Sequence, residues 1–169
     1  REVGVADRLV DAKSAAERYL DCFGREHGLA GVALRFANVY GPRQTAAGEA
    51  GVVAVFCRRL LAGETLAIHG DGRQTRDFVH VDDVAAACLA ALDAAPGAYN
   101  VATGVETEIL AVADVLCHAI APQARLVHGA PRPGDPRRSV LLPDLAFTGF
   151  GFRARVRLDV RCLVRVLRV

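Results

Sequence analysis

Several features that would point to a particular class of protein are missing from this sequence. Its 169 residues include no methionine and no tryptophan, and its apolar runs stay far below the roughly 18 residues that a membrane-spanning helix requires. No basic start with an apolar core and a small-residue cleavage site opens the chain, so we expect no signal peptide. The formal net charge is only +2, which gives no electrostatic reason to expect a nucleic-acid partner.

Cysteines at disulfide-type or metal-type spacings are also missing. The five cysteines stand at positions 22, 57, 88, 117 and 162, and no Cys-x-x-Cys pair occurs among them. An odd number of scattered thiols is typical of a reducing compartment, so we expect a cytoplasmic protein. Because the chain starts at Arg1 and contains no methionine, we expect a fragment, a processed product or a non-methionine reading frame.

The residues that are present predict one compact α/β unit. Apolar residues make up 52% of the chain, enough for a globular core. Helical spacing of apolar residues alternates with short strand-like runs, and this alternation favours an α/β fold with a partly parallel sheet. Helices are expected at 12–27, 52–61, 83–94, 107–120 and from Asp159 on, and strands at 31–36, 66–69, 76–81, 98–102 and 125–128. We expect Asp82 or Asp83 to cap the third helix and Thr107 to cap the fourth.

Two segments carry a specific resemblance. The run Arg73–Val84 follows a Gly-Asp-Gly turn, and Leu34–Gln44 lies some thirty residues upstream. In this order and spacing the segments resemble the substrate-binding half of the NAD-dependent epimerase/dehydratase family, the extended short-chain dehydrogenases, and among them most the UDP-glucose 4-epimerases. The resemblance implies the C-terminal part of a Rossmann-like fold that lacks its dinucleotide-binding half. Residues 1–11 then form an unmatched lead, and residues 12–169 form the substrate-binding half.

The resemblance also shows which cofactor residues the chain lacks. The family holds NAD on a Gly-x-x-Gly-x-x-Gly turn, and neither this turn nor a Walker-type loop occurs here. The family's catalytic pair is Tyr-x-x-x-Lys, in which Lys13 matches the lysine but Leu9 stands in place of the tyrosine. Lys13 and Ala37 match positions beside the NAD of the family, although a solvated helix lysine is the simpler interpretation of Lys13. We expect this chain alone to be inactive and to bind NAD weakly.

Three residues match positions that bind the sugar nucleotide in the family. Asn38 follows a predicted parallel strand, whose carboxyl end faces a ligand crevice in such folds. Arg76 and Arg132 match arginines on the substrate phosphates, where a guanidinium offers a bidentate fork. Two simpler interpretations remain open: Asn38 satisfies its own turn, and Arg76 forms an ion pair with Asp77 or Glu64.

Metal binding is not expected. His80, Asp82 and Asp83 offer too few ligands for a closed site, and a core hydrogen bond from His80 with helix capping by the aspartates explains them better. Two functions remain open: the half of an NAD-dependent UDP-sugar epimerase, or a non-catalytic remnant or binding module with the same fold. A nucleotide-sugar 4,6-dehydratase fragment is a further alternative. Members of the resembled family often dimerise through the helix that carries Tyr-x-x-x-Lys, so the resemblance implies a homodimer through the 12–27 helix. A missing N-terminal half is the alternative partner.

Overall fold

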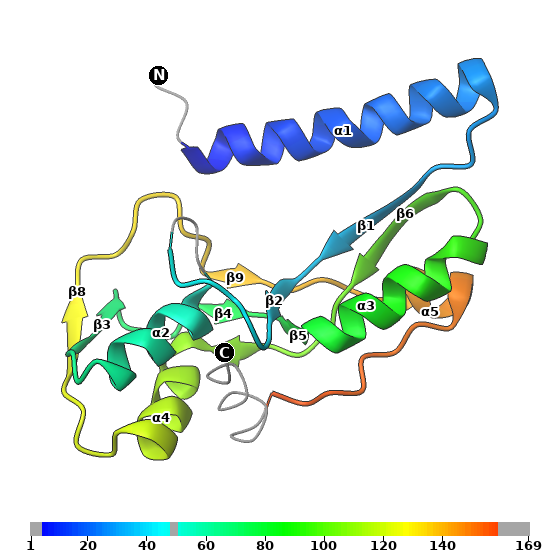
Figure 1. Cartoon of the computed structure of the whole chain (residues 1–169). Helices are drawn as coiled ribbons and strands as arrows, with labels where there is room; N and C mark the ends of the chain where they lie inside the picture. The colour runs from blue at the N-terminus through cyan, green and yellow to red at the C-terminus, as the bar shows by residue number, and fades with distance from the viewer. Residues whose placement is uncertain (1–4, 48–50, 159–169) are drawn as a thin grey trace.

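The computed structural model describes the backbone of residues 5–47 and 51–158 and the side chains of residues 11–47 and 51–158. Within these ranges the helices are α1 (Val5–His27), α2 (Val52–Leu61), α3 (Val81–Ala90), the 3-10 helix η1 (Ala91–Asp93), α4 (Ile109–Ile120) and α5 (Asp144–Phe150). The strands are β1 (Val32–Phe36), β2 (Asn38–Tyr40), β3 (Leu66–His69), β4 (Thr75–Arg76), β5 (Phe78–His80), β6 (Gly97–Val101), β7 (Thr107–Glu108), β8 (Leu126–Gly129) and β9 (Arg138–Ser139) (Figure 1). None of the described helices is long and apolar enough to cross a membrane.

Short parallel pairs dominate the strand arrangement, which confirms the predicted α/β class. β1 pairs with β6, β2 with β5 and β3 with β8, each in parallel register. β4 lies between β7, which is antiparallel to it, and β9, which is parallel. The described strands are therefore joined mostly by long crossovers, as parallel pairing requires.

Two extended runs change partner part-way along, and sequence patterning did not predict either change. At Ala37 the backbone N–H donates to Val101 in β6 (3.0 Å), whereas the next N–H, of Asn38, donates to the carbonyl of Asp77 (2.9 Å). The expected loop from residue 38 therefore begins as strand β2. The expected strand over 76–81 is likewise divided at Asp77 into β4 and β5.

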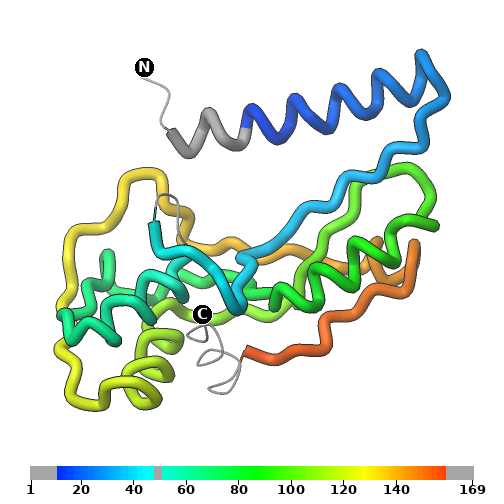
Figure 2. Tube along the Cα trace, viewed as in Figure 1, coloured from blue at the N-terminus to red at the C-terminus, as the bar shows by residue number. Residues whose placement is uncertain are grey.

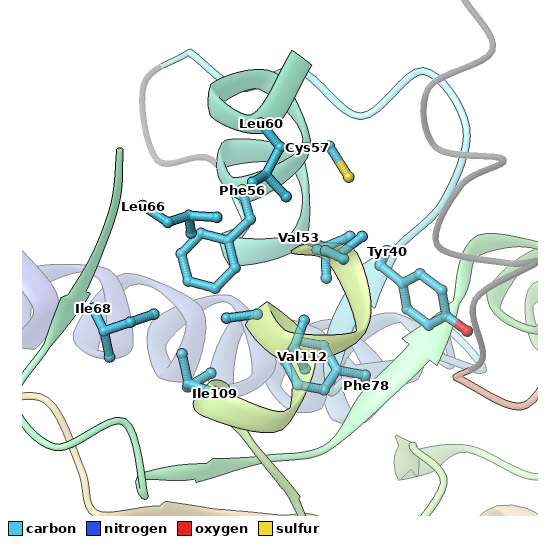
Figure 3. Close-up of a cluster of buried hydrophobic side chains, with 12 residues drawn as sticks. Tyr40, Val53, Phe56, Cys57, Leu60, Leu66, Ile68, Phe78, Ile109 and Val112 are labelled. Atoms are coloured by element: carbon cyan, nitrogen blue, oxygen red, sulfur yellow. The ribbon is translucent and has the colours of Figure 1, made fainter. Parts of the chain in front are cut away.

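The larger hydrophobic cluster lies between α2, α4 and β3 (Figure 3). Each helix contributes apolar side chains spaced three and four residues apart, which places them on one face. Its buried members are Tyr40, Val53, Phe56, Cys57, Leu60, Leu66, Ile68, Phe78, Ile109, Val112, Ala113 and Leu116. This cluster fixes α2 and β3 against each other, and both elements border the candidate site described below.

A second, smaller cluster joins α3, β5, β6 and α5. Its buried members are Val79, Val84, Ala87, Val101, Ala146 and Phe152. The buried carboxylate of Asp83 accepts hydrogen bonds from the backbone N–H groups of Arg155 (3.1 Å) and Val156 (2.9 Å). Asp83 therefore fastens the segment after α5 to the start of α3 instead of capping the helix.

The first helix differs from its prediction in length and in burial. α1 begins at Val5, seven residues before the expected start, and ends at His27 as predicted, with Gly28 at positive φ directly after it. It runs along one side of the molecule (Figure 2), and the side chains of its expected packed stripe are largely exposed, Tyr19 by 68% and Phe23 by 50%. Strand β1, which matches the strand expected at 31–36, is half-buried to exposed. The described residues provide no element that covers the α1 stripe or this strand.

The helix caps also differ from expectation. His80, rather than Asp82 or Asp83, caps α3 by accepting a hydrogen bond at Nδ1 from the Asp82 backbone N–H (3.2 Å). Glu108 occupies the N-cap position of α4, and Thr107 lies in β7. The α3 helix ends at Ala90 and continues as η1. The helix expected from Asp159 lies outside the described residues.

Candidate anion-binding site

The three residues predicted to bind substrate line one cavity of about 410 Å³. Asn38 reaches it from the start of β2, Arg76 from the end of β4, and Arg132 from the loop between β8 and β9. The remaining wall is formed mainly by α2 and β3. Because these residues are far apart in sequence, their convergence is a property of the fold and not of local spacing.

Asn38 is placed where the β1–β2 run changes partner. Its side-chain Nδ2 donates a hydrogen bond to the backbone carbonyl of Asp77 (3.0 Å). The acceptor lies between β4 and β5, 39 residues along the chain, so the amide bonds outside its own turn. The side chain remains partly exposed at the cavity wall.

Arg76 is held by the loop that carries Arg132. Its Nη1 donates to the carbonyls of Thr75 (2.7 Å) and Pro136 (2.9 Å), and its Nη2 forms an ion pair with Asp135. Only 12% of the Arg76 side chain is exposed. The expected ion-pair partners were wrong in both cases. Asp77 and Glu64 have other partners, and the acid that meets Arg76 comes from a loop 59 residues away.

Paired contacts fasten this loop to the Gly-Asp-Gly turn. His128 Nδ1 lies 2.8 Å from the carbonyl of Gly70, and His69 Nδ1 lies 3.3 Å from the carbonyl of Ala130. At the other end, Arg137 forms an ion pair with Asp71 (2.7 Å). The hydrogen bond from Arg137 lowers the pKa of Asp71 to about 2. The loop is therefore held at both ends, with Arg132 between them.

The cavity is rich in positive charge. Arg59, Arg76 and Arg132 line it together with one acid, Asp135. Within the described part of the chain, the Arg132 side chain makes no hydrogen bond or ion pair. A concave site with several guanidinium groups and few acids favours a ligand with more than one negative charge, such as a diphosphate.

Sequence reasoning missed two charged residues of this cavity. Asp135 ends the Pro-Arg-Pro-Gly-Asp loop, and its position three residues after Arg132 was a usable signal. Arg59 lies seven residues after Val52 and four after Val55, which also line the cavity. That spacing places it on the same face of α2. In the sequence, however, a charged residue at the end of an apolar stripe is more simply interpreted as a solvent-exposed residue at the helix end.

The residues matched to the cofactor lie elsewhere. Lys13 is exposed on α1, and Ala37 is half-buried where β1 passes into β2; neither lines the cavity. Leu9 belongs to the same helix, four residues before Lys13. The glycines of the turn after β3 have positive φ but pack against Pro131 and Leu110, which leaves no open cradle for a pyrophosphate there.

A larger hollow of about 670 Å³ lies elsewhere, bounded by α5 and the segment 152–158. None of Asn38, Arg76 and Arg132 lines it. We therefore choose the smaller cavity as the candidate site because several arginines converge on it, although the other hollow is larger. Within the described side chains, no group of three His, Cys, Asp or Glu residues is placed to share a metal ion.

Comparisons with known proteins bear on this arrangement. Residues 11–102 match the model of the NAD dependent epimerase/dehydratase family. UDP-glucose 4-epimerase of Mycolicibacterium smegmatis is 43% identical over 159 residues, which cover 92% of this chain and 50% of that protein. The chain spans about half the length of the curated relatives it matches, 43% in the case of a Methanocaldococcus jannaschii protein.

Solved structures show the same similarity. The crystal structure of Thermotoga maritima UDP-glucose 4-epimerase with UDP-glucose superposes with a TM-score of 0.88 at 41% identity, over 93% of this chain and 52% of that one. The Thermus thermophilus enzyme in complex with NAD superposes with a TM-score of 0.83 at 40% identity, over 91% of this chain and 51% of that one. The fold around the cavity is therefore that of about half of an extended short-chain dehydrogenase.

Proposed function

The chain belongs to the NAD-dependent epimerase/dehydratase family, and from that premise we propose that it is the sugar-nucleotide-binding half of a UDP-glucose 4-epimerase-like protein. The observation that carries the proposal is the convergence of Asn38, Arg76 and Arg132 on one cavity of about 410 Å³. The ligand is a UDP-sugar, held chiefly through its diphosphate. The related Thermotoga structure, which contains UDP-glucose, supports this class of ligand.

The proposed roles follow from the chemistry of each side chain. Arg132, whose side chain has no protein partner within the described residues, is available for a charge-assisted bond to a phosphate oxygen. Arg76 is already oriented by Thr75, Pro136 and Asp135, so it loses little side-chain entropy when a phosphate approaches. The Asn38 amide, anchored to the backbone of Asp77, adds a neutral polar contact.

Catalysis by this chain alone is not part of the proposal. NAD, when bound to a complete enzyme of this family, takes up and returns the hydride that epimerisation requires. Here Leu9 offers no proton one helical turn before Lys13, and the sequence contains no Gly-x-x-Gly-x-x-Gly turn. We therefore expect ligand binding without turnover. A binding module or remnant that keeps only the fold is the alternative, and it predicts no sugar-nucleotide affinity.

Calorimetric titration of UDP-glucose tests the proposal. We expect saturable binding by the wild-type chain and a loss of about 1.5–3 kcal/mol in Arg76→Ala, roughly ten- to a hundredfold in affinity, because a charge-assisted hydrogen bond is removed. Arg73→Ala is the matched control, since Arg73 is exposed nearby and does not line the cavity. Lys13→Ala is a second control.

Ionic strength is kept fixed in this experiment, because salt screens such contacts. NAD⁺ titrated under the same conditions is expected to give no saturable binding near micromolar concentration. If Arg76→Ala keeps the wild-type affinity for UDP-glucose while Lys13→Ala loses affinity, the phosphate site lies elsewhere. A wild-type chain without affinity for UDP-glucose would favour the remnant.

A further inference from the structure

Arg59 is a third arginine of the cavity, and its Nε atom has no hydrogen-bond acceptor among the described residues. It lies near the end of α2, and its Nε atom is shielded from solvent but makes no hydrogen bond within the described part of the chain. The nearest acid is Glu64, whose Oε2 lies 3.9 Å from this Nε. That distance is beyond a hydrogen bond, and a shielded donor without an acceptor is costly.

Glu64 is also shared with a neighbouring arginine. Arg58, the preceding residue of α2, lies 3.6 Å from Glu64 Oε1 and is exposed by 53%. Glu64 therefore keeps a cationic partner when Arg59 turns away from it. This leaves the Arg59 guanidinium free to meet an acceptor inside the cavity.

A charge balance indicates what that acceptor is. Asp135 already neutralises Arg76 through their ion pair. Arg59 and Arg132 are the cavity cations without a hydrogen-bonded acid among the described residues. The diphosphate of a sugar nucleotide carries two formal negative charges, which these two guanidinium groups would match.

We propose that Arg59 binds a non-bridging oxygen of the ligand's diphosphate, as a third phosphate-binding residue beside Arg76 and Arg132. This inference rests on the proposed function and adds a residue to the same site. Its shielded Nε gains an acceptor when the ligand binds, and its weak contact with Glu64 is exchanged for a charge-assisted bond.

The test compares two adjacent arginines of one helix. UDP-glucose is titrated against the wild-type chain, Arg59→Ala, Arg59→Gln, Arg59→Lys and Arg58→Ala at one ionic strength. Arg58→Ala is the matched control, because it removes the same charge from the same helix but Arg58 does not line the cavity. We expect Arg59→Ala and Arg59→Gln to lose about tenfold in affinity, Arg59→Lys to recover part of the loss, and Arg58→Ala to stay within about twofold.

Thermal melts followed by circular dichroism check that the variants fold. If Arg59→Ala does not fold, the comparison is made with Arg59→Gln and Arg59→Lys. Equal losses in Arg58→Ala and the Arg59 variants would indicate a general charge effect and overturn the inference. If Arg59→Gln binds UDP-glucose as tightly as wild type while Arg76→Ala binds more weakly, the inference is overturned and the proposed function stays intact. Absence of wild-type binding would overturn the proposed function and this inference together.

Discussion

Asp77 shows that a residue within a substrate-binding motif can have a purely structural role. It follows Arg76 directly, yet its side chain is fully buried. One carboxylate oxygen accepts hydrogen bonds from the backbone N–H (3.0 Å) and hydroxyl (2.7 Å) of Thr103, and the other from the Gly104 N–H (2.8 Å). Asp77 therefore ties β5 to the end of β6, and this fixes the point from which Arg76 enters the cavity.

The Asp71–Arg137 pair gives a prediction about one titrating group. The pKa of Asp71 is lowered from 3.8 to about 2, first by the hydrogen bond from Arg137 and then by the Arg73 backbone N–H. Because the pKa is lower in the folded chain than in the unfolded one, the pair stabilises the fold above the ordinary carboxyl pKa. That contribution is lost as the pH falls through about 2.

We expect Arg137→Ala to raise the pKa of Asp71 toward 3.8, as measured by NMR titration of its carboxyl carbon. Arg73→Ala is the control, since it keeps the backbone N–H and should change this pKa little. Because the pair is exposed, neither variant should change the overall stability measurably. An unchanged Asp71 pKa in Arg137→Ala would show that the loop is not fastened through this contact.

At the scale of elements, helices that bury a full apolar stripe were predictable. In α2 and α4 the spacing of apolar residues indicates which face is buried, and the side chains of that face belong to the larger cluster. The stripe of α1 has the same periodicity, but Tyr19 and Phe23 are exposed. Periodicity indicates a helix and a candidate face, whereas burial needs a partner, which one chain's sequence does not reveal.

Strand partners and the cavity show the same limit. The changes of partner at Ala37 and Asp77 depend on which strands meet in space, so no local pattern announces them. Asn38, Arg76 and Arg132 were recognisable as candidate ligands from motifs. Arg59 was not, because its importance comes from facing the same cavity across the fold.

The turn before β4 yields a prediction about glycine. Gly72 has φ of +75°, and a Cβ there would lie 2.9 Å from Ile68 Cγ2 and 3.0 Å from Leu110 Cβ. Gly63 has a similar φ of +68° with nothing within 4 Å. Gly63→Ala should therefore lose only the roughly 1–2 kcal/mol of left-handed strain, and Gly72→Ala about 1–3 kcal/mol more from overpacking.

Urea unfolding of both variants against wild type measures the difference. Gly63→Ala separates backbone strain from packing, because the two glycines share the conformation and not the neighbours. Equal losses of unfolding free energy in the two variants would contradict the described packing of the turn against β3 and α4.

At the scale of the whole molecule, apolar surface is left uncovered. Tyr19, Phe23, Leu89 and Leu92 are exposed by 50% to 80%. Among the described strands β1 has only β6 as a neighbour. An open strand edge and exposed large apolar side chains favour association, and the chain spans only about half the length of its relatives. We propose that a second copy of the chain covers this surface.

We expect the purified chain to elute from size exclusion as concentration-dependent oligomers and to melt with low cooperativity. Replacing Tyr19 and Phe23 together by serine should shift the elution toward the monomer, because it removes apolar surface from α1 without touching either core cluster. A clean monomer at every concentration, with a sharp melt, would count against an uncovered binding surface.

The central claim is that one cavity of about 410 Å³ holds the diphosphate of a sugar nucleotide. A crystal structure of the chain with UDP-glucose bound tests it most directly. We expect the two phosphates to lie between Arg76 and Arg132, with Asn38 within hydrogen-bond distance of the ligand. UDP-glucose bound in the larger hollow beside α5, or bound with its phosphates turned away from both arginines, would contradict it.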